Sequence, residues 1–216
     1  MTPCSYTELI DAFMTCGIER VLRSYFGSDS CINSTRVLLE ICRAYGLAAD
    51  GFPVRTQVFS RAFMQRAHRE GRLPEDHELR SWCAQPGVWS VGIGYGTPEM
   101  DATRWPGHLV LRAGRSYLID ATISQASRPA RGIAMPDMLV IDAVPPEFWR
   151  GHGIVTADTP DGSWLRYEPD LGNTYYLHSP GWALRPGVEA AAYQEILLLL
   201  QTSGGLPATR RKEGAA

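Results

Sequence analysis

The sequence predicts an α+β fold in which N-terminal helices pack on one side of an antiparallel β-sheet. The first part of the chain carries apolar residues at helical spacing, and most of the chain beyond it consists of short apolar runs separated by Gly, Pro and Asp turns. A length of 216 residues, with 44% apolar and 20% charged residues, is ordinary for one globular core. We therefore expect a single domain over residues 1–203 and a disordered tail over residues 204–216, which has no apolar period.

Helix starts and apolar stripes locate the helices. Ser5 and Glu8 form a capping-box pattern before an apolar stripe, which predicts a first helix over residues 6–24. Good N-cap residues precede a second stripe, so a second helix is expected to begin almost on Cys31. A last helix over residues 188–201 closes the predicted domain.

Apolar runs between these helices predict the strands of the sheet. The candidates are residues 52–59, 88–95, 107–112, 117–121, 138–143, 163–168 and 174–178. After the first of them, the polar and charged segment 61–86 predicts two short helices. We interpret this segment as an insertion over the functional site that could act as a lid.

Charge, hydropathy and cysteine usage limit the function classes. A net charge of -2, with both signs mixed along the chain, gives no reason to expect nucleic acid or an anionic membrane as a partner. No apolar run is long enough to span a bilayer and the N-terminus does not resemble a secretory signal, which predicts a cytoplasmic protein. The odd number of cysteines, without a Cys-x-x-Cys pair, disfavours a disulfide framework and a zinc site. We therefore expect free thiols and neither a metal nor a cofactor, while the oligomeric state stays open.

Among the cysteines, Cys31 is the candidate nucleophile because it lies at a predicted helix start. The partial positive charge and free N–H groups of a helix N-terminus favour the thiolate, which is the reactive form. The same amides can donate hydrogen bonds to the oxyanion that forms when a thiolate attacks an acyl carbon. Cys4, Cys16, Cys42 and Cys83 have no such start signal. The alternative is that Cys31 is a small buried residue of the core.

A catalytic base has to come from another part of the chain, and His108 is the first candidate. It begins a predicted strand, and Asp120 ends the next strand after a glycine turn. In an antiparallel hairpin these side chains share a face only if the turn is odd in length or bulged, which we therefore predict. Asp120 would then accept a hydrogen bond from one nitrogen of His108, leaving the other to face Cys31. His178 is a second candidate base, and a structural hairpin with a polar edge is the alternative.

Three segments together resemble the transglutaminase-like superfamily of papain-like cysteine enzymes. Cys31 at a helix start is followed by the stretch Arg-Ala-Tyr-Gly-Leu at 43–47 and then a strand, which looks like the nucleophile segment of that superfamily. Residues 107–112 and 117–122 are similar to its His strand and its Asp-x-Thr strand. The resemblance implies a papain-like α+β fold with a Cys-His-Asp triad, in that chain order, that transfers acyl groups through a thioester.

The reaction expected from this resemblance is hydrolysis of a peptide or another amide bond. An amine-accepting transglutaminase and a CoA-dependent N-acyltransferase are alternatives, and a non-catalytic binding protein on the same fold is the alternative from another class. Tyr25, six residues before Cys31, is the candidate second oxyanion donor, unless it packs at the end of the first helix. Gln125 follows the strand that ends in Asp120 and could line the cleft.

Overall fold

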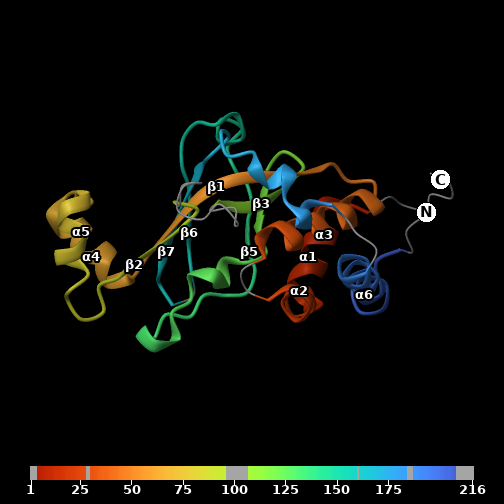
Figure 1. The fold of residues 1–216 in the computed structure, drawn as a ribbon, viewed down its shortest axis with the longest axis horizontal. Coiled ribbons are helices and arrows are strands. Elements are labelled where there is room, and N and C mark those ends of the chain that lie inside the picture. The colour runs from red at the N-terminus through yellow and green to blue at the C-terminus, as the bar shows by residue number, and fades with distance from the viewer. Residues whose placement is uncertain (1–3, 28–29, 96–106, 160, 184–186, 208–216) are drawn as a thin grey trace.

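The chain folds into an α+β structure in which helices cover one side of an antiparallel sheet (Figure 1). The computed structural model describes residues 4–27, 30–95, 107–159, 161–183 and 187–207. The helical layer consists of α1 (Tyr6–Thr15), α2 (Ile18–Phe26), α3 (Cys31–Ala44) and α6 (Val188–Thr202). The predicted α+β class is therefore confirmed.

A sheet is built around the long strand β1 (Ala49–Phe59), and the strand pairs in the described residues are antiparallel. The other strands are β2 (Ser90–Ile93), β3 (His108–Ala113), β4 (Tyr117–Asp120), β5 (Leu139–Ile141), β6 (Val155–Asp158) and β7 (Trp164–Pro169). Their order is β5-β4-β3-β1-β7-β6, and β2 pairs with β1. Strands β3 and β2 follow one another along one edge of β1, while β7 occupies the other edge. The start of β3 therefore lies in the middle of the sheet.

The two faces of the sheet have separate apolar cores. The core between the sheet and the helical layer includes Leu38 and Leu111. The core on the other face includes Val110 and Tyr167. Because side chains alternate along a strand, His108 projects to the same face as Val110, and the strand register adds Tyr167 to that face.

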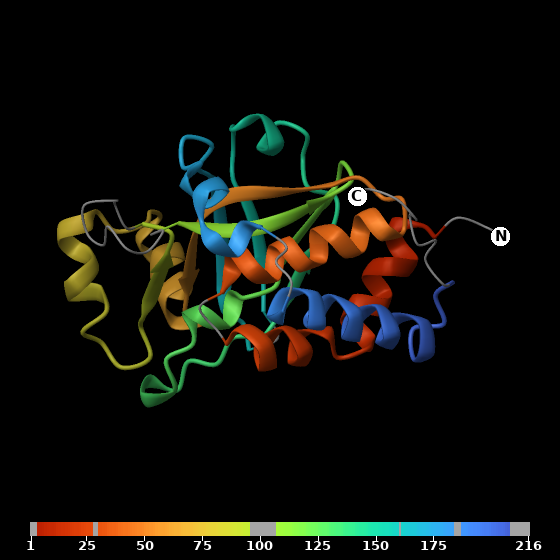
Figure 2. The same ribbon diagram turned by 45° about the vertical axis from the view of Figure 1, so that its right-hand side comes forward.

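The segment between β1 and β2 forms the two helices that its sequence predicts, α4 (Arg61–Glu70) and α5 (Asp76–Trp82). Both helices contribute to an apolar cluster with Phe59 and Val88, at the far end of β1. Figures 1 and 2 show the pair at one end of the molecule, away from α6. The insertion therefore extends the end of the sheet.

The single helix predicted over residues 6–24 is wrong, because the chain breaks at Gly17 into α1 and α2. Gly17 has a φ of +73°, a left-handed conformation that glycine adopts without steric cost and that a helix interior excludes. The capping box of Ser5 and Glu8 at the start of α1 is present as predicted. The apolar stripe continues across the break, so helical spacing alone does not reveal it.

The strand predicted over residues 174–178 is also wrong, and β6 was not predicted. Tyr175–His178 form a short 3-10 helix, η4, in which Tyr176 packs against Cys31 instead of joining the sheet. Strand β6 has a weak apolar signal, since Val155 is its one buried residue. Both errors occur where tertiary contacts, rather than local pattern, decide the structure.

The segment after α6 returns to the helical core. The N–H of Leu206 donates to the carbonyl oxygen of Leu200 at 3.0 Å, and its side chain packs on the helical core. Of the predicted disordered tail, residues 204–207 are thus held by contacts, and residues 208–216 lie outside the described residues. Within the described ranges, no helix combines the length and the apolar character needed to cross a membrane.

Candidate active site

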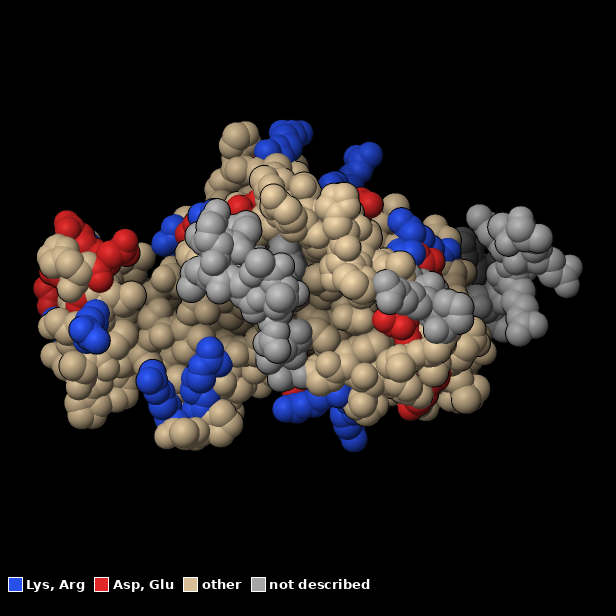
Figure 3. All heavy atoms as spheres, in the orientation of Figure 1, with Lys and Arg blue, Asp and Glu red and all other residues tan. Residues whose placement is uncertain are grey.

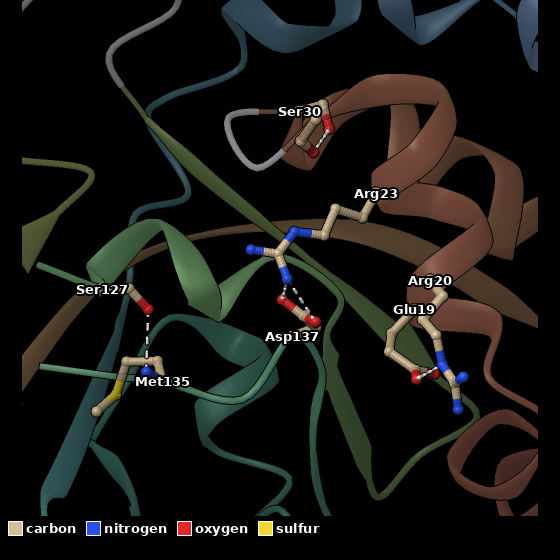
Figure 4. Close-up of polar contacts among 8 residues, drawn as sticks. Glu19, Arg20, Arg23, Ser30, Ser127, Met135 and Asp137 are labelled. Carbon is tan, nitrogen blue, oxygen red and sulfur yellow. Dashed lines mark hydrogen bonds and ion pairs between the residues drawn. The ribbon is translucent and has the colours of Figure 1, made fainter. Parts of the chain in front are cut away.

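Cys31 is the first residue of α3, close to the position that its sequence context predicts, and its side chain is buried. Ser30 occupies the N-cap position but does not cap the helix with its side chain. Its hydroxyl instead donates to the carbonyl oxygen of Gly27 at 2.9 Å (Figure 4). The first-turn amides of α3 are thus left without a side-chain cap where the helix dipole is positive. This position suits a thiolate and the oxyanion of an acyl intermediate.

His108 and Asp120 form a fully buried pair. Nε2 of His108 lies 2.7 Å from Oδ2 of Asp120, and both side chains are 0% exposed. The backbone N–H of Thr122 donates to Oδ1 of Asp120 at 3.0 Å, and the hydroxyl of Tyr167 donates to Oδ2 at 3.0 Å. Three donors therefore hold the carboxylate in one orientation.

The turn between β3 and β4 has an odd number of residues, as predicted. Ala113 pairs with Tyr117, which leaves a three-residue turn between them. In this register Asp120 lies diagonally across from His108 on the same face of the sheet, within hydrogen-bond reach. The hairpin alone therefore brings these two residues together.

The charge state of His108 is set by its neighbours. Burial lowers the pKa of His108, but the Asp120 carboxylate and then Cys31 more than offset this effect and raise it from 6.5 to about 10. The other ring nitrogen, Nδ1, is buried and has no hydrogen-bond partner among the described residues. Cys31 contributes to the raised pKa of His108, so its sulfur lies near the ring, but no hydrogen bond joins the two. The Asp120 carboxylate thus favours the protonated form of His108.

One buried hydrogen bond ties the helix of Cys31 to the strand of His108. The hydroxyl of Thr35, one turn into α3, donates to the carbonyl oxygen of Leu109 at 3.2 Å. The side chain of Leu109 is fully buried and packs against Cys31. Leu109, the residue next to His108, is therefore in contact with both the first turn of α3 and Cys31.

Tyr167 completes the surroundings of the pair from β7. Burial and the nearby Asp120 carboxylate raise the pKa of Tyr167 well above its ordinary value. Its hydroxyl therefore stays protonated and remains a donor to Asp120 throughout the usual pH range. No local pattern marks this residue, because it is brought to Asp120 by the pairing of β7 with β1.

Gly94 is packed against the start of β3, with a left-handed φ of +81°. A Cβ there would lie 2.7 Å from the carbonyl oxygen of Val54 and 3.1 Å from the backbone nitrogen of His108. We expect Gly94→Ala to lower the free energy of unfolding by roughly 3 kcal/mol or more, because backbone strain adds to a clash with backbone atoms. The same change should displace His108 and slow alkylation of Cys31.

Gly87→Ala is the matched control for this prediction. Gly87 has a similar φ of +74°, but nothing lies within 4 Å of the position of its Cβ. Its substitution should cost only the left-handed strain, about 1–2 kcal/mol. Urea unfolding of the two variants measures the difference, and equal losses would show that Gly94 has no special part in placing His108.

Aromatic side chains cover Cys31 from the segment that precedes α6. Tyr176 of η4 and Trp182 of the 3-10 turn η5 (Pro180–Trp182) pack on Cys31 in a small apolar cluster. Their rings meet edge to face with centroids 4.8 Å apart, and the guanidinium of Arg36 lies 5.6 Å from the centroid of Trp182. Cys31 is only 7% exposed, so this cover limits access to the sulfur.

Removal of one of these aromatic rings should make Cys31 more reactive than it is in the parent protein. Trp182→Ala removes a ring from the cover while leaving His108 and Asp120 intact, so alkylation of Cys31 by iodoacetamide should become roughly tenfold faster. Tyr175→Ala is the control, because that neighbouring ring is 62% exposed. The Cys31 peptide is followed by mass spectrometry, and a rate unchanged or lowered by Trp182→Ala would argue against the cover.

The remaining site candidates have different surroundings. The hydroxyl of Tyr25 donates to the carboxylate of Glu195 at 2.9 Å, so this donor is occupied by a hydrogen bond between α2 and α6. Gln125 lies in the 3-10 helix η1 (Ile123–Ala126), and its Nε2 is buried without a hydrogen-bond partner among the described residues. His178 is exposed at the end of η4. Of these three, Gln125 offers the unused buried donor.

The chain after η1 is tied to the helix that precedes Cys31. The guanidinium of Arg23 in α2 donates to both carboxylate oxygens of Asp137 at 2.8 Å (Figure 4). The backbone N–H of Met135 donates to the hydroxyl of Ser127 at 3.0 Å, which folds this segment on itself. A cavity of about 460 Å³ lies between α2 and the segment. The ion pair thus closes one side of this cavity.

Comparisons of the chain with protein-family models, curated proteins and solved structures found no match. Within the described part of the chain, no group of three or more His, Cys, Asp or Glu side chains could hold a metal ion. The functional interpretation therefore depends on the geometry around Cys31, His108 and Asp120.

Proposed function

We propose that this chain is a cysteine enzyme of papain-like and transglutaminase-like type that transfers acyl groups through a thioester and hydrolyses a peptide or another amide bond. The observation that carries the proposal is the arrangement of three side chains. Cys31 lies at the N-terminus of α3 beside His108, and the far nitrogen of His108 is bonded to the buried carboxylate of Asp120. This is the order of nucleophile, base and orienting group that acyl transfer needs.

The first half of the reaction uses Cys31 as a thiolate and His108 as an imidazolium. The thiolate attacks the carbonyl carbon of the amide, and the electron pair of the C=O bond moves to the oxygen, which accepts from the first-turn amides of α3. The intermediate collapses, the C–N bond breaks, and Nδ1 of His108 gives its proton to the leaving amine. The acyl group remains on Cys31 as a thioester, and His108 is left neutral.

The second half reverses the roles. Neutral His108 takes a proton from water as the water oxygen attacks the thioester carbon, and collapse of the intermediate releases the acid and the Cys31 thiolate. An amine in place of water would give amide transfer by the same steps. Asp120 accepts from Nε2 throughout, so the ring keeps its orientation while Nδ1 gains and loses the proton.

Alkylation kinetics test the proposal without knowledge of the substrate. Iodoacetamide near pH 7 should alkylate Cys31 faster than a free thiol, and His108→Ala should slow this rate roughly tenfold or more, because the imidazolium no longer stabilises the thiolate. Cys83, which is partly exposed, serves as an internal control whose rate should be the same in both proteins. A Cys31 alkylation rate that equals that of a free thiol and is unchanged by His108→Ala would exclude the proposed mechanism.

Trapping of the acyl group then separates an enzyme from a binding protein on the same fold. The protein and its Asp120→Ala variant are incubated with a cell lysate, and adducts on the Cys31 peptide are identified by mass spectrometry. An acyl mass on Cys31 in the parent protein, absent from the variant, supports turnover and reveals the acyl group. Fast alkylation without any adduct or product would favour the binding protein.

A further inference from the structure

A second cavity, of about 490 Å³, lies between α4 and the hairpin of β6 and β7. It is lined by Arg61, Met64, Gln65, His68, Arg69, Asp158, Gly162 and Trp164. None of the three candidate catalytic residues lines it. Its volume is in the range that holds small organic ligands in proteins.

The α4 side of this cavity is cationic. Arg61 and Arg69 are exposed and recur at a spacing that puts them on one face of the helix, which also carries His68. Neither Arg61 nor Arg69 has a carboxylate within salt-bridge distance among the residues that the structure describes. In contrast, Arg66 on another face of α4 pairs with Glu70 at 3.7 Å and lies 4.3 Å from the centroid of the Trp82 ring. Of the three arginines in α4, the two without a carboxylate partner among the described residues are thus the two that line the cavity.

The opposite side of the cavity is aromatic and carries a single acidic residue. Trp164 of β7 is partly buried, with its ring 5.6 Å from that of Phe59. Asp158 of β6 pairs directly with Trp164, so both side chains project from the same face of the hairpin towards α4. Two arginines therefore face one carboxylate across the cavity, which leaves an excess of positive charge.

The acidic residue in the hairpin turn, Asp161, does not neutralise Arg61, because its carboxylate is bonded within the turn. The carboxylate of Asp161 accepts hydrogen bonds from the N–H of Ser163 at 3.1 Å, from the Ser163 hydroxyl at 3.0 Å, and from the hydroxyl of Thr159. Gly162 has a φ of +80°, and a Cβ there would lie 3.2 Å from Cδ of Arg61. The absence of a side chain at Gly162 thus lets the aliphatic stem of Arg61 lie against the turn.

We propose that this cavity binds a small organic anion that carries a planar ring. The anionic oxygens bind the guanidinium groups of Arg61 and Arg69, which match carboxylate and phosphate geometry. The ring lies against Trp164 and Met64, where an apolar surface is already formed by the hairpin and the helix. Asp158 restricts the site to ligands of low negative charge. This site is independent of the chemistry proposed for Cys31.

Calorimetric titration of the full-length protein tests the proposal with simple probes. Phenyl phosphate and benzoate carry both parts of the ligand, inorganic phosphate and acetate carry only the anion, and benzyl alcohol carries only the ring. One of the first two should bind at least tenfold more tightly than its ring-free counterpart and than benzyl alcohol. Equal affinities for the ring-bearing and ring-free anions would overturn the proposal.

Variants locate the binding. Arg61→Gln and Arg69→Gln should each weaken the better probe roughly tenfold, since each removes a charge-assisted hydrogen bond. Arg80→Gln, which removes an exposed cation of α5 outside the cavity, should leave the affinity unchanged. Equal weakening by Arg80→Gln would mean non-specific attraction and would overturn the site. Cys31→Ala should bind the probe as well as the parent protein, so the outcome does not depend on the proposed catalysis.

Discussion

Asp120→Asn is expected to lower the free energy of unfolding by roughly 3–5 kcal/mol, the usual cost of removing one partner from a buried charge pair. The carboxylate accepts from Nε2 of His108, the backbone of Thr122 and the hydroxyl of Tyr167. An amide in its place carries no charge and turns an NH₂ group towards one of these donors. The variant therefore loses the counter-ion of His108 and at least one hydrogen bond, and urea unfolding at pH 7 measures the loss.

Tyr167→Phe is the matched control, because it removes one donor to Asp120 and leaves both charges in place. It should cost about 1–2 kcal/mol, as expected for a single buried hydrogen bond. Asp120→Asn should also slow alkylation of Cys31, whereas Tyr167→Phe should change that rate little. A stability of Asp120→Asn within about 1 kcal/mol of the parent protein would contradict the buried ion pair.

The second large effect is a loss of stability as pH rises from about 6.5 to about 10. His108 has a pKa of about 10 in the folded protein, against 6.5 in the unfolded chain. Between these values His108 itself binds one more proton in the folded state than in the unfolded state, so its own contribution is complete below pH 6.5 and declines above it. The proposed Cys31 thiolate has lost the proton that the unfolded thiol keeps, which offsets the proton gained by His108, so the full decline is expected in a Cys31→Ala protein. The decline should approach about 1.4 kcal/mol per pH unit near the middle of this window.

His108→Gln in a Cys31→Ala background isolates this contribution. Urea unfolding of Cys31→Ala and of Cys31→Ala with His108→Gln is compared at several pH values between 6 and 9.5, and the difference in free energy should shrink as pH rises. Burial raises the pKa of Cys42 to about 12, which adds a decline of its own at the alkaline end. That decline is common to both proteins and cancels in the difference. A difference that does not change with pH would mean that His108 is not protonated in the folded protein at neutral pH.

The local elements of the fold follow from sequence patterns where the cause is local. The capping box at Ser5, the start of α3 at Cys31 and the end of that helix before Gly46 depend on residues a few positions apart. The strands of the central sheet are likewise marked by apolar runs. In contrast, the break at Gly17 interrupts a continuous apolar stripe, so the pattern does not distinguish it from one long helix.

The residues of the candidate site can likewise be predicted from the sequence where their signal is local. The sequence indicates Cys31 because a helix start is a local signal, and it indicates His108 and Asp120 because a hairpin of odd turn length joins them. The hairpin prediction can be made from parity alone, since side chains alternate along a strand. The sequence indicates Gln125 only by its place after β4. Its Nε2 is buried and has no hydrogen-bond partner among the described residues.

Other residues of the site are brought to it by packing between distant segments, and local sequence patterns do not indicate them. Tyr167 reaches Asp120 through the pairing of β7 with β1, and Gly94 meets His108 because β2 and β3 share one edge of β1. Trp182 covers Cys31 from the segment that follows residues 174–178, for which the pattern predicted a strand. Contacts between distant segments depend on the whole register of the sheet, and no window of sequence contains that information.

By itself, then, the sequence determined the α+β class, the position of Cys31 at a helix start and the hairpin that joins His108 to Asp120. The tertiary structure alone decided that His108 is fully buried with a raised pKa, that Tyr167 donates to the Asp120 carboxylate, and that aromatic rings cover Cys31. The physical reason is that helix caps and strand parity act over a few residues, whereas burial and pKa depend on every element packed around a group.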